Sequence, residues 1–191
     1  MLKLKNSHKT IAGMIHVAAL PGTPTNSKSI QQIIELARKE ASMLLDAGID
    51  AMMIENMHDV PYLKGEVGPE IVASMTAVAG ELRKLTTKPL GIQILAAANK
   101  QALAVAQATG FDFIRAEGFV YGHLADEGYI ESCAGELLRY RKAIGAENVA
   151  VFTDIKKKHS SHTLTSDISL AETVKTAEYF LSDGVIITGS S

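Results

Sequence analysis

The stretch Val149-Ala-Val-Phe-Thr-Asp-Ile-Lys-Lys-Lys-His-Ser-Ser-His162 decides the fold that we predict for this chain. It opens with four consecutive apolar residues, which is typical of a strand buried on both faces of a parallel sheet. Charged residues follow at once, beginning with Asp154. In α/β sheets and barrels, ligands bind at the carboxyl ends of the parallel strands. The stretch therefore predicts a parallel sheet with a polar site at this edge.

The direction of the charged side chains depends on how far the strand geometry continues. Strand alternation would place Asp154, Lys156 and Lys158 on one face. The alternative is that the three lysines form a solvated loop and that Asp154 caps a neighbouring element. This alternative is weaker for Asp154 than for the lysines, because Asp154 lies nearest the apolar run.

Strand and helix patterns alternate on both sides of this stretch. Strands are expected at residues 11–17, 50–55, 89–95, 112–117, 149–155 and 184–188. Helices are expected at residues 28–47, 69–85, 99–108, 130–144 and 169–181. A long loop is expected at 118–128, and a loop rich in Ser and Thr after the fifth strand. This alternation predicts an α/β fold with a parallel sheet.

A sequence repeat favours a barrel over an open sheet. The segments Ala47-Gly-Ile-Asp50, Thr109-Gly-Phe-Asp112 and Leu181-Ser-Asp-Gly184 precede the second, fourth and sixth strands. Five residues beyond the aspartate of each segment lies a polar residue, which is Glu55, Glu117 or Thr188. Because alternate strands fill the interior of a (β/α)₈ barrel in layers, matched even strands favour the (β/α)₈ TIM-barrel type.

The length of the chain limits this barrel. Six strands cannot close a barrel that has eight, and a (β/α)₈ barrel needs about 200 residues or more. We expect residues 1–191 to form a single domain that is an incomplete barrel, truncated at its C-terminal end. The unpaired backbone groups of the two open edges would tend to pair with another chain. We therefore expect a homo-oligomer.

Composition excludes several classes of partner. The net charge is -2 and the pI about 6.3, so we expect no nucleic-acid partner. No apolar run approaches the length of a membrane helix, and the N-terminus lacks a secretory h-region. The single cysteine, Cys133, fits a reducing compartment. We expect a cytoplasmic protein without a membrane partner, with organellar import left open.

Several motifs resemble the BtpA family in order and spacing. They are Ile11-Ala-Gly-Met-Ile-His-Val-Ala-Ala-Leu-Pro-Gly-Thr-Pro24, Gly48-Ile-Asp-Ala-Met-Met-Ile-Glu-Asn56, Ala108-Thr-Gly-Phe-Asp-Phe-Ile-Arg115, Glu136-Leu-Leu-Arg-Tyr-Arg141 and Asp183-Gly-Val-Ile-Ile-Thr-Gly189. The resemblance implies a TIM barrel close to the ribulose-phosphate-binding group, with a role in photosystem I biogenesis for its named member. It also implies that the later part of the family, with its glycine-rich phosphate loops, is absent here. The Glu117-Gly-Phe119 segment departs from the bacterial pattern.

Polar residues at the strand ends are the candidate site. The expected catalytic residues are His16, Glu55, Glu117, Asp154, Lys158 and His159, and the expected substrate-binding residues are Asn56, Gln93, Arg115 and Thr188. The carboxylates Glu55, Glu117 and Asp154 could alternatively hold a divalent metal, although no metal motif is present and no cofactor is identified. Lys156 or Lys158 could form a Schiff base. His16 could instead be a hydrogen-bonded histidine at the core edge, and Arg115 could simply pair with Glu117.

Two functions of different class follow. The first is an enzyme of lyase, isomerase or hydrolase type, acting on a small phosphorylated or carbonyl-bearing metabolite by acid–base or metal-assisted chemistry. The second is a non-catalytic assembly or stability factor for a protein complex, which the family resemblance suggests. The polar residues at the strand ends favour the enzyme, because an assembly factor does not need them directed at one place.

Overall fold

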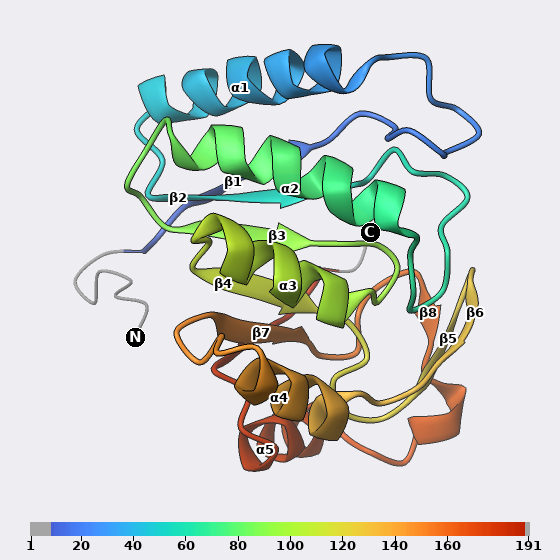
Figure 1. Cartoon of the computed structure of the whole chain (residues 1–191). Coiled ribbons are helices and arrows are strands. Elements are labelled where there is room, and N and C mark those ends of the chain that lie inside the picture. Colours follow the sequence, from blue (N-terminus) through green and yellow to red (C-terminus); the bar gives the residue numbers. More distant parts are fainter. Residues whose placement is uncertain (1–8, 190–191) are drawn as a thin grey trace.

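A computed structural model describes residues 9–189 of the chain and contains a parallel sheet of six strands (Figure 1). The order is β1-β2-β3-β4-β7-β9, and every neighbouring pair is parallel. The strands are β1 (Ala12–His16), β2 (Ala51–Glu55), β3 (Leu90–Gln93), β4 (Phe113–Ala116), β7 (Ala150–Asp154) and β9 (Gly184–Ile186). The predicted parallel α/β sheet is therefore confirmed.

Five helices connect these strands and cover one face of the sheet (Figure 1). They are α1 (Ile30–Asp46), α2 (Pro69–Arg83), α3 (Asn99–Thr109), α4 (Ala134–Ala143) and α5 (Leu170–Tyr179). The first and last helices each begin with a capping box, Ser29 with Gln32 and Ser169 with Glu172. Pro69 occupies the first turn of α2, where its missing N–H removes no helical hydrogen bond.

Strand alternation divides the side chains of the sheet between two faces. One set, which includes Ile15, Ile92 and Val151, packs with the helices in the main core. The other set forms a smaller apolar cluster of Met53, Phe113, Ala150 and Phe152 on the inner face. The ring of Phe113 lies where a Cβ at Gly91 would stand, at 2.1 Å, so the glycine makes room for the aromatic side chain.

The segment expected to be a long loop at 118–128 contains strand structure instead. The strands β5 (His123–Ala125) and β6 (Gly128–Ile130) form an antiparallel hairpin, and β5 also pairs with β8 (Ser160–Ser161). Gly128 closes the turn at a φ of 108°, a conformation that favours glycine. Because β6 occupies residues 128–130, α4 begins at Ala134 and not at residue 130 as predicted. A short 3₁₀ helix, η1 (Thr163–Thr165), follows β8.

The three aspartates of the predicted repeat have one structural role. We call Asp50, Asp112 and Asp183 the entry aspartates. Each accepts a backbone N–H at or beside the start of the neighbouring earlier strand: Ile11 N at 3.0 Å, Leu90 N at 2.9 Å and Val151 N at 2.8 Å. The last two also pair with an arginine, Arg83 for Asp112 and Arg141 for Asp183. The repeat thus ties the strands together as β1–β2, β3–β4 and β7–β9.

Replacement of an entry aspartate by alanine is expected to destabilise the fold. Each variant leaves a backbone N–H without its acceptor, a loss of about 0.5–1.5 kcal/mol for hydrogen bonds that are exposed or partly buried. Asp112→Ala and Asp183→Ala should have larger effects than Asp50→Ala, because each also removes an ion pair with an arginine. Urea unfolding measures the difference. Asp46→Ala, at an exposed position at the end of α1, is the matched control and should unfold like the wild type.

Both edges of the sheet are open within the described residues. There β1 pairs only with β2, and β9 only with β7. Apolar side chains lie exposed beside these edges, with Ile11 64 % and Ile187 60 % accessible. The sheet is therefore an incomplete barrel with six strands in place, as predicted.

Candidate active site

A cavity of about 410 Å³ opens at the carboxyl ends of the strands. The candidate residues that line it are His16, Glu55, Arg115, Glu117, Lys158, His159 and Thr188. Alternation explains this grouping, because the register sets His16 beside Glu55 and Glu55 beside Gln93 on one face of the sheet. The structure brings His16, Glu55, Arg115 and Glu117 together around this cavity. Asp154 pairs with Arg115 and lines a smaller neighbouring cavity.

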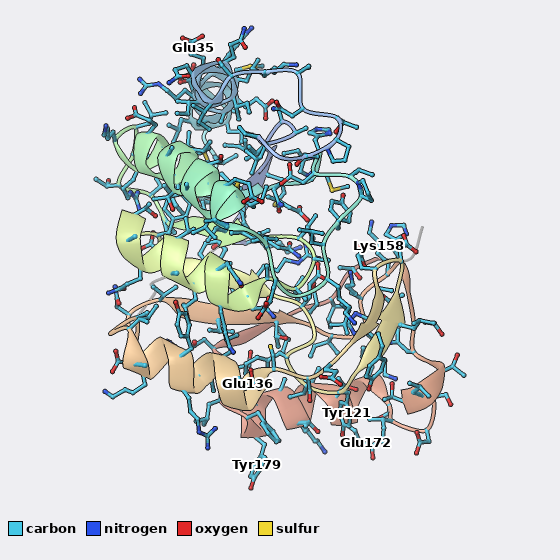
Figure 2. The ribbon with its side chains drawn as sticks, turned by 45° about the vertical axis from the view of Figure 1, so that its right-hand side comes forward. Glu35, Tyr121, Glu136, Lys158, Glu172 and Tyr179 are labelled. Atoms are coloured by element: carbon cyan, nitrogen blue, oxygen red, sulfur yellow. The ribbon has the colours of Figure 1, made fainter. Side chains whose placement is uncertain are left out.

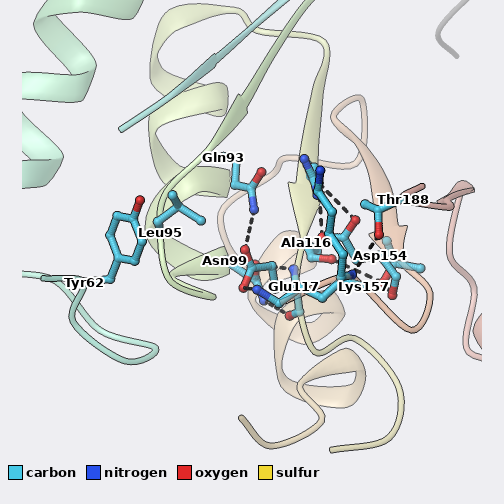
Figure 3. A network of polar contacts seen from close by, with 12 residues as sticks. Tyr62, Gln93, Leu95, Asn99, Ala116, Glu117, Asp154, Lys157 and Thr188 are labelled. Carbon is cyan, nitrogen blue, oxygen red and sulfur yellow. Dashed lines mark hydrogen bonds and ion pairs between the residues drawn. The ribbon is translucent and has the colours of Figure 1, made fainter. Parts of the chain in front are cut away.

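Glu117 is the centre of the polar network (Figure 3). Gln93 donates its amide N–H to Glu117 Oε1 at 2.6 Å, and Lys157 Nζ lies 3.1 Å from Oε2. Asn99 at the start of α3 holds the Glu117 backbone through both of its side-chain polar atoms. Only 2 % of the residue is accessible. Burial raises the pKa of the Glu117 carboxyl, and the Lys157 ammonium opposes that rise.

A second buried ion pair lies beside the first. Arg115 donates its Nε–H to both oxygens of Asp154, at 3.0 and 3.1 Å. Arg115 therefore pairs with the next strand, and not with Glu117 as the sequence had left open. Burial raises the pKa of Asp154, while Arg115 lowers it. Each buried carboxylate thus has its own cation, which buried charges require.

Glu55 is a further buried carboxylate, which lines the cavity and is held more loosely. Its Oε2 lies 3.9 Å from His16 Nε2, at the long limit for an ion pair. Burial is the largest influence on its pKa and raises it, opposed by Arg115 and His16. Glu55 therefore presents a desolvated carboxyl to the cavity while the oxygens of Glu117 and Asp154 are already engaged.

Lys157 was missed by the sequence prediction, which selected Lys156 and Lys158. Strand alternation ends at Asp154, where β7 ends. Lys156 has a φ of 45°, which turns the backbone so that Lys157, and not Lys156, points to the inner face of the sheet. Lys156 instead donates to the Thr165 carbonyl. Lys158 is exposed at the mouth of the cavity, near the β5–β6 hairpin (Figure 2). Its backbone N–H donates to Thr188 Oγ1 at 2.9 Å.

Asn56 lies outside this cavity. Its Nδ2 donates to Asp59 Oδ2 and its Oδ1 accepts the Leu95 N–H, so the side chain braces two loops. The sequence prediction also missed Tyr62, Asp126 and Glu127, which line the cavity from loops and from the hairpin turn. Loop residues such as these carry no periodic pattern that would have indicated their direction.

A divalent metal held by Glu55, Glu117 and Asp154 stays a prediction. Within residues 9–189, no three His, Cys, Asp or Glu side chains make a group that could hold a metal ion. The oxygens of Glu117 and Asp154 are taken up by Gln93, Lys157 and Arg115.

A pair of histidines lies behind the network. His123 on β5 is 6 % accessible, and its ring centroid is 5.5 Å from that of His162. Its Nε2 is buried and has no hydrogen-bond partner among the described residues. It lines a cavity of about 20 Å³, room for one water molecule, together with Asp154 and Lys157. Burial is the main cause that lowers the pKa of His123 to about 4, and the charges of Lys157 and His162 contribute to the same shift.

This lowered pKa predicts a loss of stability in acid. Between pH 6.5 and about 4 the unfolded chain binds a proton at His123 and the folded chain does not, so stability falls as the pH falls. His123→Leu should remove this contribution and flatten the curve by at most about 1.4 kcal/mol per pH unit. Urea midpoints measured across this range for both proteins test the prediction. Parallel curves would contradict it.

Three solved structures define the class of this protein. They are 7,8-dihydropteroate synthase from Vibrio fischeri (TM-score 0.55, 15 % identity), 2,3-dimethylmalate lyase (0.53, 14 %) and L-ribulose 3-epimerase (0.51, 15 %). The alignments cover 93–96 % of this chain and 58–63 % of those chains. At such identities the likeness shows the fold alone. It places the chain among the TIM-barrel α/β proteins, with about three fifths of the length of these structures.

The particular family follows from sequence comparison. The BtpA family model matches residues 7–191, and the chain belongs to the BtpA family. An uncharacterized mitochondrial protein of Caenorhabditis elegans is 55 % identical over 98 % of this chain and 70 % of its own length. The photosystem I biogenesis protein BtpA of Synechocystis is 34 % identical over 96 % of this chain and 63 % of its own length. Among the described residues, every helix is too short or too polar to span a membrane.

Proposed function

We propose that this protein is an enzyme that performs acid–base chemistry of lyase or isomerase type on a small carbonyl-bearing or phosphorylated metabolite. One observation carries the proposal. Two buried carboxyls with raised pKa values, Glu55 and Glu117, line one cavity of about 410 Å³ at the carboxyl edge of the sheet together with the cations Arg115 and Lys157. A third buried carboxyl with a raised pKa, Asp154, pairs with Arg115 beside the cavity. Titratable groups whose pKa values are perturbed by burial and by specific charge partners are typical of active sites.

Glu55 is the general base of the proposed reaction. It faces the cavity with a desolvated carboxyl, and a raised pKa makes a carboxylate a stronger base near neutral pH. It removes a proton from the carbon next to the substrate carbonyl. The electron pair of the broken C–H bond moves to the carbonyl oxygen, which becomes an enolate. Where the deprotonated carbon carries a hydroxyl group, the enolate is an enediolate. Glu55 then returns the proton to the former carbonyl carbon, the former carbonyl oxygen takes the proton of the hydroxyl group, and the new carbonyl forms on the neighbouring carbon.

Arg115 and Lys157 stabilise the charge that develops in this step. Both cations line the cavity, and their carboxylate partners fix them before substrate binds. Preorganised cations in a site of low dielectric stabilise an oxyanion more strongly than the same groups in water. His16, Lys158 and His159 lie at the mouth of the cavity, where they meet an anionic group of the substrate.

The names of the structural neighbours are consistent with a small substrate, since they describe a synthase, a lyase and an epimerase. The name of the nematode relative supports mitochondrial import as an alternative to a cytoplasmic location. The name of the cyanobacterial relative supports the second function, an assembly or stability factor for a protein complex. The buried ion pairs favour the enzyme, because a docking surface makes no use of charges enclosed beneath a cavity.

Exchange of substrate protons with solvent tests the proposal. Small 2-oxo acids, ketoses and ketose phosphates are incubated with the protein in D₂O, and NMR follows the loss of the proton next to the carbonyl. We expect exchange with one of these classes, and a loss of about 10²–10⁴-fold in Glu55→Gln, the usual contribution of a general base. Glu147→Gln, an exposed carboxyl distant from the cavity, is the matched control. Absence of binding and exchange with every class would overturn the enzyme proposal and leave the assembly role.

A further inference from the structure

The segment that carries Lys157 has an unusual backbone. Lys156 and His159, on either side of it, have φ values of 45° and 58°. Residues other than glycine rarely adopt this left-handed conformation, and they keep it where surrounding contacts enforce it. Lys157 is thus held between two strained positions, and the contacts that hold the segment determine where its ammonium lies.

Three hydrogen bonds fix this segment from outside. Lys156 Nζ donates to the Thr165 carbonyl at 2.9 Å, and the Lys158 backbone N–H donates to Thr188 Oγ1 at 2.9 Å. The third joins His162 Nε2 to the Lys157 carbonyl oxygen at 3.0 Å. Because a carbonyl only accepts hydrogen bonds, His162 must carry a proton on Nε2 and donate it. Only this third bond acts on Lys157 itself.

His162 is fixed in turn by the small three-stranded sheet. It directly follows β8, whose residues Ser160 and Ser161 pair with Ala125 and Leu124 of β5. Its ring packs against that of His123, which is buried on the same strand β5. A continuous set of contacts therefore runs from the hairpin through two histidine rings to the backbone of Lys157, and from there to Glu117.

We propose that His162 is a positioning residue for Lys157. By donating to the Lys157 carbonyl, it keeps the segment in its strained conformation and the Lys157 ammonium on Glu117. The small sheet β6-β5-β8 then serves as the rigid support of the site. The importance of this role for catalysis rests on the proposed function, whereas the positioning itself can be measured without any substrate.

The test measures the exposure of the Lys157 amine to a chemical reagent. Native protein is treated briefly with limiting acetic anhydride, and peptide mass spectrometry gives the acetylation rate of each lysine. In the wild type, Lys157 should react more slowly than the exposed Lys28. His162→Leu should speed acetylation of Lys157 about fivefold, the size expected for loss of one hydrogen bond, with Lys28 unchanged. His162→Gln, whose amide can still donate, should restore most of the protection.

Ser166→Ala, at a nearby exposed position, is the control and should leave Lys157 protected. An unchanged rate at Lys157 in a folded His162→Leu protein would overturn the proposal. So would a parallel rise at all lysines, which would mean general loosening. If His162→Leu does not fold, equal acetylation of Lys157 in His162→Gln and wild type supports the proposal, and a fivefold rise contradicts it. A change at Lys157 without proton exchange in any variant would instead refute the proposed enzyme while the positioning role stands.

Discussion

Replacement of Lys157 by methionine is expected to lower the free energy of unfolding by about 3–5 kcal/mol, because it leaves a buried carboxylate without its cation. Glu117 has 2 % of its surface accessible and cannot regain solvent in place of Lys157. The loss should be smallest in acid, where the raised pKa lets Glu117 bind a proton, and should grow as the pH rises. Urea unfolding at several pH values measures both effects.

A double-mutant cycle separates the ion pair from packing. Glu117→Gln combined with Lys157→Met removes both charges, and the double variant should be more stable than the sum of the two single losses predicts. The exposed pair of Lys142 with Glu147 provides the control, and Lys142→Met should produce no measurable change. Simple additivity of the Glu117 and Lys157 variants would show that the two side chains do not interact in the folded protein.

The chain of residues 1–191, expressed alone, is expected to self-associate through its sheet edges. The outer edges of β1 and β9 have no strand partner among the described residues, and each presents backbone groups that can pair with another chain. Ile11 and Ile187 add exposed apolar surface beside these edges. Sedimentation velocity over a range of concentrations should therefore show oligomers or larger assemblies.

Charges placed at the edges should prevent this association. Ile11→Lys with Ile187→Lys puts a lysine beside each open strand, a device that natural edge strands use. We expect this variant to shift strongly towards the monomer. Val60→Lys, at an exposed apolar position in a loop away from both edges, should leave the association unchanged. A wild-type chain that is monomeric at all concentrations would refute the prediction of a homo-oligomer by this route.

Alternation along strands accounts for the part of the site that sequence could locate. Glu55 and Asp154 are the last residues of β2 and β7, Glu117 directly follows β4, and all three are in phase with the inner face of the sheet, so the pleat places them on the same side. The same rule would have excluded Asn56, since it comes one residue after Glu55 and must point to the other side. Beyond the last residues of a strand, alternation between the two faces no longer predicts the direction of a side chain.

Beyond the strand ends, the sequence patterns that predict structure are weaker or absent. The β5–β6 hairpin does have such a pattern, because Asp126-Glu127-Gly128 is a turn sequence between two short apolar segments. Lys157 had none, because nothing local indicates that Lys156, a residue with a side chain, adopts a positive φ. That conformation is enforced by Thr165, His162 and Thr188, which lie up to about thirty residues further along the chain.

The entry aspartates also bear on how this protein is made. Each receives its N–H from a residue synthesised earlier, 39 positions before Asp50, 22 before Asp112 and 32 before Asp183. A ribosome releases the chain from its N-terminus, so both partners of each bond have emerged once the aspartate has emerged. None of these three bonds requires a segment that is synthesised later, although the domain as a whole folds as one unit.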